Sequence, residues 1–262
     1  MTSRQANPVR TRLDKLLVER KLAPSRERAQ ALILAGKVLV NEQKIEKAGT
    51  PVEFNATLRL LGDDLRYVSR GGLKLEKALD HWHIDLAGKL CLDIGASTGG
   101  FTDCMLQHGA RGVVAVDTGY GQMDFRLRHD PRIRLLEKTN ARYLKAADIG
   151  DEVIDFIAMD VSFISATLVL PAVVQSAFGT RERPPLEPGK IVVLVKPQFE
   201  VGRELVGKGG IIRDQAAQHA AVHKIEGALG VLGANRIEWI DSPILGAEGN
   251  REFLLYAELS AM

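Results

Sequence analysis

One stretch constrains the fold of this chain more than any other: residues 90–101, Leu-Cys-Leu-Asp-Ile-Gly-Ala-Ser-Thr-Gly-Gly-Phe. Its apolar first half predicts a buried strand over residues 90–94, and its glycines predict a sharp turn that lets the backbone approach a ligand. The residues after the turn predict a helix, whose first N–H groups and positive dipole end face that ligand. This order of elements indicates a nucleotide-type site in an open α/β sheet.

Strand and helix patterns alternate through the rest of the chain after this turn. Further strands are predicted over residues 112–116, 133–136, 156–159, 191–195, 237–240 and 253–257. Helices are predicted over residues 101–108, 164–178 and 214–232, and an earlier helix begins near Gly72 with Ser69 as its N-cap. Such alternation is typical of a mostly parallel, doubly wound sheet.

Charge divides the chain into two unequal parts. Residues 1–60 carry a net charge of +6 and the remainder carries −4, although the whole chain is close to neutral at +2. A basic module joined to a mildly acidic one indicates a polyanionic partner for the first part. We assign the first domain to residues 1–61, a linker to 62–68 and the larger domain to 69–262, with residues 1–10 as a disordered arm.

The basic module contains two short helical patterns followed by a small hairpin. Leu13 and Leu16 share one helix face, Ser25 predicts the N-cap of a second helix, and Gly36 ends it. The matching runs are Arg12-Leu13-Asp14-Lys15-Leu16-Leu17, Ser25-Arg26, Leu32-Ile33 and Gly36-Lys37-Val38 with Val40-Asn41. This pattern resembles the S-four type of RNA-binding module, which is named after a small-subunit ribosomal protein.

That resemblance implies that basic side chains of the module contact RNA phosphates and position the protein, rather than read bases. The candidate RNA-binding residues are Arg12, Lys15, Arg20, Arg26, Arg28 and Lys37. A basic helical hairpin that is merely solvated remains the alternative.

Several functional classes are disfavoured by the composition. The two cysteines, Cys91 and Cys104, predict no disulfide framework and suit a reducing, cytoplasmic setting. The first residues lack the apolar core of a signal peptide, and no apolar run approaches the length of a membrane span, so we expect no membrane partner. His219 and His223 share a helix face but have no evident third ligand, so no metal is predicted.

The second strand of the larger domain ends at Asp117, an acid that can accept hydrogen bonds from both ribose hydroxyls of a nucleoside. The same geometry suits NAD, whose fingerprint is G-x-G-x-x-G. Here an acid precedes the first glycine, in Asp93-Ile94-Gly95, and Gly99-Gly100 follow. This spacing is closer to the turn that binds S-adenosylmethionine (AdoMet), although the turn by itself leaves both ligands open.

Later strand ends carry residues that discriminate between these ligands. The strand over 156–159 is followed by Asp160-Val161-Ser162-Phe163-Ile164-Ser165, and the strand over 191–195 by Lys196-Pro197-Gln198-Phe199-Glu200. Glu252 comes directly before the last strand, and Lys74 lies on the helix before the first strand of the larger domain. In chain order these positions give Lys, Asp, Lys and Glu, which could converge beside a cofactor.

With these motifs the chain is similar to the TlyA family, whose members are often labelled haemolysins and resemble FtsJ-type ribose methyltransferases. The resemblance runs from Arg12 to Glu258, and the segments after Met159 and Val195 are its most specific motifs. It implies a Rossmann-like class I methyltransferase sheet with an antiparallel last strand, behind a small α+β RNA-binding domain. It also implies AdoMet-dependent 2′-O-methylation of ribosomal RNA, typically at cytidine.

By that resemblance Lys74, Asp160, Lys196 and Glu252 form the catalytic tetrad. Lys196 is the candidate base, because a ribose hydroxyl is a weak nucleophile that must lose its proton during methyl transfer. The candidate cofactor contacts are Asp93, Gly95, Ser97, Gly99 and Gly100 in the first turn, Asp117 on the ribose and Asn140 at the adenine edge. Asn140 could equally cap a turn.

Each tetrad residue also has a plain structural reading: a solvated lysine, a helix cap or an edge charge. The expected partners are ribosomal RNA or ribosomal subunits, and we infer no obligate protein partner. Two other functions remain open at this point: a membrane-active haemolysin, and a non-catalytic RNA-binding factor of the ribosome.

Overall fold

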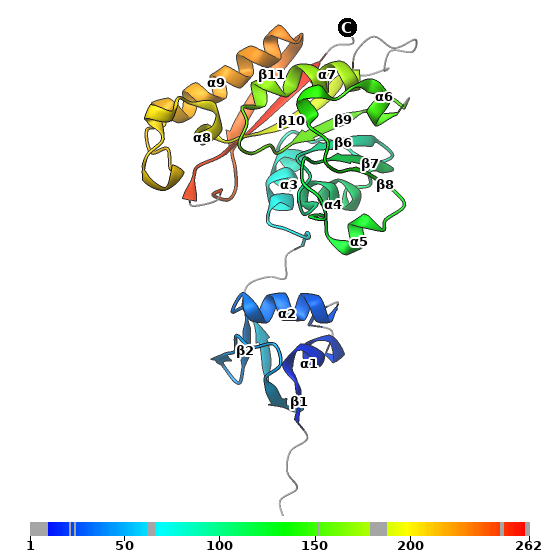
Figure 1. Cartoon of the computed structure of the whole chain (residues 1–262), viewed down its shortest axis with the longest axis vertical. Helices are drawn as coiled ribbons and strands as arrows, with labels where there is room; N and C mark the ends of the chain where they lie inside the picture. The colour runs from blue at the N-terminus through cyan, green and yellow to red at the C-terminus, as the bar shows by residue number, and fades with distance from the viewer. Residues whose placement is uncertain are drawn as a thin grey trace, which may run out of the picture. The chain divides into compact units, whose positions relative to one another are not determined.

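The structure is a computed structural model that describes residues 10–20, 22–23, 25–61, 66–150, 152–178, 188–246 and 249–259. The chain divides into two compact units, one ending at Leu65 and the other beginning at Arg66 (Figure 1). Residues 1–9 of the expected arm and residues 62–65 of the expected linker lie outside the described residues.

The first unit packs two helices against two small sheets. The helices are α1 (Leu13–Glu19) and α2 (Arg26–Leu34). The strands are β1 (Arg10–Arg12), β2 (Val38–Val40), β3 (Gln43–Lys44), β4 (Pro51–Glu53) and β5 (Leu58–Leu60). β1 pairs with β4, and the other strands form a sheet in the order β3-β2-β5.

Side chains from both helices and from β2 and β4 form the core of this unit, among them Leu16, Ile33 and Val52. Ser25 caps α2 as predicted, because its side chain accepts a hydrogen bond from the Arg28 N–H. The sequence did not predict β1 and β4, and Arg10 lies in β1 rather than in a disordered arm. Strands of three residues with at most one buried position carry too little alternation to be recognised.

The second unit is built on a seven-stranded sheet in the order β11-β12-β10-β9-β6-β7-β8. Its strands are β6 (Leu90–Ile94), β7 (Gly112–Val116), β8 (Ile133–Leu136), β9 (Phe156–Met159), β10 (Gly189–Val195), β11 (Ala234–Asp241) and β12 (Phe253–Leu259). The pairs among β6 to β10 are parallel, whereas β12 runs antiparallel to both β10 and β11. The predicted sheet, including its antiparallel last strand, is therefore confirmed.

Helices cover both faces of this sheet. They are α3 (Gly71–His81), α4 (Gly100–Gln107), α5 (Phe125–Arg128), α6 (Ala146–Ile149), α7 (Leu170–Phe178), α8 (Pro197–Glu200) and α9 (Gln215–Val231), with short 3-10 turns η1 (Ala141–Tyr143), η2 (Ala166–Leu168), η3 (Arg203–Leu205) and η4 (Lys208–Gly210). Figure 1 shows α3, α4 and α5 on one side of the sheet and α6, α7 and α9 on the other.

Strand periodicity explains this double cover. Along β6, Leu92 and Ile94 belong to the core cluster that includes α7 and α9, whereas Cys91 belongs to the cluster that includes α3 and α4. Successive side chains of a strand point to opposite faces, so a strand that is apolar throughout needs helices on both sides.

Two helix starts differ from the sequence prediction. The helix predicted over residues 164–178 is split: η2 comes first and α7 begins at Leu170, because Pro171 has no backbone N–H to donate to a preceding turn. Ser69 does not cap α3. The N-cap position is Arg70, with no side-chain cap bond. The Ser69 hydroxyl instead packs against Gly100, where an added Cβ would lie 2.2 Å from the hydroxyl oxygen.

Candidate active site

The site lies where the strand order reverses, between β6 and β9 at the carboxyl edge of the sheet. The Asp160 N–H donates to the Ile94 carbonyl over 2.8 Å, which joins the two strand ends. Gly95 turns away from β6 with φ +84°, and a Cβ there would lie 2.3 Å from the Asp160 carbonyl oxygen. Only glycine suits this position, because both the backbone angle and the close approach exclude a side chain.

Two adjoining cavities open at this point. The first, here called the α3 cavity, is lined by residues of α3, the glycine-rich turn and the 244–246 segment, including Arg70, Lys74, Gly100 and Leu245. The second, the β7 cavity, occupies about 430 Å³ and is lined by residues that follow β6, β7, β8 and β9.

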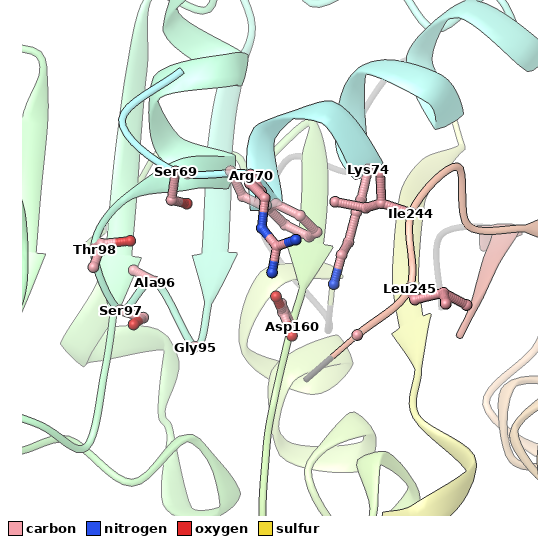
Figure 2. A pocket seen from close by; sticks show the side chains of 14 residues that line it. Ser69, Arg70, Lys74, Gly95, Ala96, Ser97, Thr98, Asp160, Ile244 and Leu245 are labelled. Carbon is pink, nitrogen blue, oxygen red and sulfur yellow. The ribbon is translucent and has the colours of Figure 1, made fainter. Parts of the chain in front are cut away.

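Both cavities share Gly95, Ser97 and Asp160 as lining residues. Figure 2 shows Arg70 and Lys74 reaching from α3 toward Asp160 across the α3 cavity. A ligand with a nucleoside at one end and an amino-acid group at the other could extend through both, since pockets of a few hundred Å³ hold such molecules.

Lys74 and Glu252 form a buried ion pair beside the α3 cavity. The Lys74 Nζ lies 2.5 Å from Glu252 Oε2, and the Glu252 side chain is only 2% exposed. A Cβ on Gly246 would lie 2.0 Å from Glu252 Oε1, so the chain passes tightly over the carboxylate. A buried charge needs a partner of opposite sign, and here each residue supplies the other.

Lys196 and Asp160 form a second ion pair at the ends of β10 and β9. The Lys196 Nζ lies 2.5 Å from Asp160 Oδ1 and donates to the Ser162 hydroxyl over 2.7 Å. One member of each pair, Lys74 in the first and Asp160 in the second, lines the α3 cavity. Each lysine is held by a carboxylate, and the two pairs are linked through the cavity that Lys74 and Asp160 share.

Asp93 differs from the other candidate cofactor contacts. Its carboxyl is fully buried, accepts a hydrogen bond of 2.5 Å from the Thr102 hydroxyl, and lines neither cavity. Burial raises its pKa to about 7. The structure therefore places Asp93 beneath the turn, where it ties β6 to the first turn of α4.

Gly99 also supports the turn from outside both cavities. It has φ +94° at the N-cap of α4, and a Cβ there would lie 2.4 Å from Leu127 Cδ1. Gly100, by contrast, lines the α3 cavity.

Asp117 and Asn140 both line the β7 cavity. The Asp117 carboxylate accepts from the Ser97 N–H over 2.8 Å and from the Gly119 N–H over 2.6 Å, which fixes its orientation. The Asn140 side-chain oxygen accepts from the Arg142 N–H and caps η1. Its amide N–H groups remain as donors, so the cap and a ligand contact are compatible.

The candidate RNA-binding residues of the first unit fall into two groups. Arg12 and Arg26 both bond Asp14, a buried carboxylate whose pKa the Arg12 guanidinium holds well below its usual range. Arg20 donates to the carbonyls of Phe54 and Ala56. These three arginines are thus also structural. Lys15 is exposed, and Arg28 and Lys37 are half-buried.

Four residues beside the tetrad were not singled out from sequence as site residues. Arg70 and Ser162 line the cavities, and Glu200 ends the short helix α8 after Lys196, where its carboxylate accepts from the Ala166 N–H. Phe163 lines the β7 cavity with φ +65° and is 92% exposed, 5.3 Å from the Phe199 ring. An exposed, strained aromatic residue at a site is a candidate stacking surface for a base. The sequence signal for Ser162, Phe163 and Glu200 was their place in the two specific motifs, whereas Arg70 lies outside both.

Two further classes of feature were sought among the described residues. No helix in the described ranges has both the length and the hydrophobicity of a membrane span. Across the same part of the chain, no three His, Cys, Asp or Glu side chains are grouped to hold a metal ion.

Comparison with known proteins gives two family matches and close relatives. Residues 67–259 match the FtsJ-like methyltransferase family, and residues 11–58 match the S4 domain. The 16S/23S rRNA (cytidine-2′-O)-methyltransferase TlyA of Mycobacterium tuberculosis is 44% identical over 94% of this chain and 89% of its own length. Hemolysin A of Brachyspira hyodysenteriae is 40% identical over 94% of this chain and 98% of its own length.

A solved structure of a candidate hemolysin from Streptococcus thermophilus shares 40% identity and a TM-score of 0.69, covering 97% of this chain and 90% of the other. The family match spans most of the second unit, and the relatives align along nearly the whole chain. This chain joins an N-terminal S4 domain to the methyltransferase fold, and it belongs to the FtsJ-like methyltransferases, within the TlyA family.

Proposed function

We propose that this protein transfers a methyl group from AdoMet to a ribose 2′-hydroxyl of ribosomal RNA, at cytidine, with Lys196 as the base. The observation that carries the proposal is the two lysine–carboxylate contacts beside the glycine-rich turn, each with one member, Lys74 or Asp160, in the lining of the α3 cavity. The relative from Mycobacterium tuberculosis is named for 2′-O-methylation of ribosomal RNA at cytidine, and its name supports the choice of this RNA and this nucleoside as the substrate.

The residues of the two cavities suit AdoMet. Asp117 offers a carboxylate to ribose hydroxyls, Asn140 offers amide donors to an adenine edge, and Gly95 leaves the backbone open to close approach. When bound, AdoMet supplies an electrophilic methyl group on a positively charged sulfur. Of the two acids in the proposed tetrad, Asp160 is the one that lines both cavities.

As a neutral amine, Lys196 would accept the ribose hydroxyl proton at its Nζ during methyl transfer, and the ammonium so formed is the state that pairs with Asp160. Asp160 and Ser162 fix the direction of that nitrogen through contacts of 2.5 and 2.7 Å. Lys74, held by Glu252, orients the substrate oxygen from the other side of the α3 cavity. Correct placement of reacting groups is the main contribution that fixed side chains make to such a transfer.

In this proposed function, the two domains of the chain have different roles. Residues 1–61 bind RNA phosphates through exposed lysine and arginine side chains, residues 62–68 connect, and residues 69–262 carry out methyl transfer. Ribosomal RNA or a ribosomal subunit is then the partner, and the cytoplasm is the place of action.

Methyl incorporation tests this function directly. The pure protein is incubated with AdoMet labelled in its methyl group and with unmethylated small or large ribosomal subunits, assayed separately. The expected product is RNA with labelled, alkali-resistant dinucleotides that contain cytidine, because a 2′-O-methyl group blocks hydrolysis of the next phosphodiester bond. Label in a base, or no label with either subunit while AdoMet binds, would contradict the proposal.

A parallel arm addresses the hemolysin label of the relatives. The same preparation is added to erythrocytes and to liposomes with and without AdoMet. We expect no lysis. Lysis that is independent of AdoMet, together with absent methylation, would favour a membrane-active protein instead.

A further inference from the structure

Glu200 lies at the end of α8, the single helical turn that follows Lys196 directly. Its side chain is only 3% exposed, and nothing assigned to the proposed reaction uses it. Its Oε1 accepts from the Ala166 N–H over 2.7 Å, and its Oε2 accepts from the Ser165 hydroxyl over 2.5 Å. The carboxylate therefore joins the segment after β10 to the segment after β9.

The neighbouring Lys224 on α9 completes this junction. Its Nζ lies 3.2 Å from Glu200 Oε2, donates to the Glu200 carbonyl over 2.8 Å, and reaches the Ser165 hydroxyl over 3.3 Å. One buried carboxylate is thus held by a backbone N–H, a hydroxyl and an ammonium group. A set of charge-assisted bonds of this kind fixes the position of the groups that make it.

The junction matters because the sheet itself does not align the catalytic pair. The parallel register of β9 and β10 ends with Met159 opposite Val193, before either Asp160 or Lys196. Asp160 is anchored to β6 through its backbone N–H, which leaves its alignment with Lys196 to contacts beyond the strands. Glu200 supplies buried polar contacts between those two segments at Ser165 and Ala166.

We propose that Glu200 is a positioning residue: it holds the β9 and β10 extensions together so that the Asp160–Lys196 pair keeps its geometry. The expected effect on the rate of methyl transfer rests on the proposed function. The expected effect on the Asp160–Lys196 contact does not depend on any reaction. Glu200 itself touches neither Asp160 nor Lys196 in the contacts of the described residues, so it acts through the backbone.

A matched control lies at the opposite end of β9. The Asp155 carboxylate accepts from the Leu90 N–H over 2.8 Å at the amino edge of the sheet, far along the strand from Asp160. Asp155→Ala and Glu200→Ala both remove a carboxylate that bonds a backbone N–H. A general loss of stability would affect both variants, whereas a loss of alignment would affect only Glu200→Ala.

The geometric test uses a zero-length carbodiimide cross-link on the full-length chain, read by mass spectrometry of peptides. In the wild type, Lys196–Asp160 should form an amide link, because the pair is in contact and the Asp160 side chain is 23% exposed to the reagent. Glu200→Ala should lose most of this link, and Asp155→Ala should retain it. Equal Lys196–Asp160 yields in all three proteins would overturn the inference.

The kinetic test measures single-turnover methylation of ribosomal subunits at saturating AdoMet. Glu200→Ala should slow the transfer step by about tenfold or more, since small displacements of reacting groups cost that much. The AdoMet affinity and the RNA KM of Glu200→Ala should stay within about twofold of the wild type. Asp155→Ala should methylate at the wild-type rate. Glu200→Gln should recover part of the lost rate, because its side chain keeps one acceptor oxygen.

A wild-type protein that cross-links as expected but methylates neither subunit would refute the proposed function and leave the positioning role standing. If Glu200→Ala does not fold, Glu200→Gln is compared with Asp155→Ala in both assays. A Glu200→Gln variant with the wild-type rate and the wild-type cross-link yield would then overturn the inference.

Discussion

Lys74–Glu252 and Lys196–Asp160 have the same charges and the same 2.5 Å contact, but they differ in exposure. The Glu252 side chain is 2% exposed and the Asp160 side chain is 23% exposed. The more buried pair has the greater structural cost when one member is removed, because the remaining charge loses both its partner and water. The two lysine side chains are almost equally exposed, at 11% and 13%, so the difference between the pairs lies in their carboxylates.

A double-mutant cycle on the buried pair tests this difference. Glu252→Leu should lower the free energy of unfolding by about 3 kcal/mol, and adding Lys74→Met should restore a large part of it, because the unpaired charge is then gone. Both tryptophans, Trp82 and Trp239, lie in the second unit, so their fluorescence in urea follows that unit alone. Strictly additive effects of the two substitutions would refute this account of the pair.

Asp93 predicts an unusual pH dependence of stability. Its pKa in the folded protein is about 7, above the usual 3.8, so between these values the folded state binds more protons than the unfolded state. The free energy of unfolding should therefore fall as pH rises from about 4 to about 7, and level off above that.

Asp93→Asn keeps an acceptor for Thr102 and removes the titration. Its stability relative to wild type should rise by about 2 to 4 kcal/mol between pH 4.5 and pH 8, measured by urea unfolding. Thr102→Val is the companion variant, because it removes the hydroxyl but leaves the carboxyl. A difference between Asp93→Asn and wild type that does not vary with pH would show that the carboxyl is not perturbed.

At the scale of elements, the glycine-rich turn shows how much of the site could be read from sequence. The bounds of β6, β7, β8 and β9 match the predicted strands, because each is a short apolar run followed by a turn signal. The different structural roles of the turn residues could not be predicted from the sequence. Gly95 opens the cavity, whereas Asp93 and Gly99 support the turn from beneath, and only packing against Thr102 and Leu127 distinguishes them.

Contacts between distant segments account for the rest. Family motifs predicted that Lys74, Asp160, Lys196 and Glu252 converge. The structure shows two separate contacts, Lys74–Glu252 and Lys196–Asp160, and this division into pairs was not predicted. That division depends on how α3 and the start of β12 pack, which no local pattern encodes. The structural roles of Arg12, Arg20 and Arg26 were missed for the same reason, since their partners Asp14, Phe54 and Ala56 lie across the first unit.

The turn itself predicts the outcome of a small substitution. Gly95→Ala places a methyl group 2.3 Å from the Asp160 carbonyl at φ +84°, so β6 and β9 must separate at the site. AdoMet affinity, measured by calorimetry, should fall by about tenfold or more. Gly227→Ala on α9 has nothing within 4 Å of the new methyl group and should bind AdoMet normally. Unchanged affinity in Gly95→Ala would contradict the placement of the cofactor.

At the scale of the whole molecule, the two units differ in charge as well as in fold. The net charge of +6 over residues 1–60 against −4 over the remainder assigns RNA attraction to the first unit. The second unit holds all four proposed catalytic residues. RNA affinity and the rate of methyl transfer should therefore respond to different substitutions.

Salt dependence separates these two effects. Lys15→Gln on the exposed side of α1 should weaken binding of ribosomal RNA and reduce the slope of log affinity against log salt by about 0.7 to 0.9, the value for one lost phosphate contact. Its transfer rate at saturating RNA should be unchanged. Lys77→Gln on α3 makes the same charge change in the second unit and should leave the slope unaltered. Equal slopes for Lys15→Gln and wild type would remove Lys15 from the RNA-binding surface.

The most direct test of the account is single-turnover methylation by Lys196→Ala with saturating AdoMet and ribosomal subunits. The account predicts a rate at least about a thousandfold below wild type, with AdoMet affinity and RNA affinity within about twofold, because the variant lacks only the amine that accepts the proton. Asp160→Asn, which keeps the side-chain shape, should give an intermediate rate. Full methylation by Lys196→Ala would contradict the central claim that this lysine is the base.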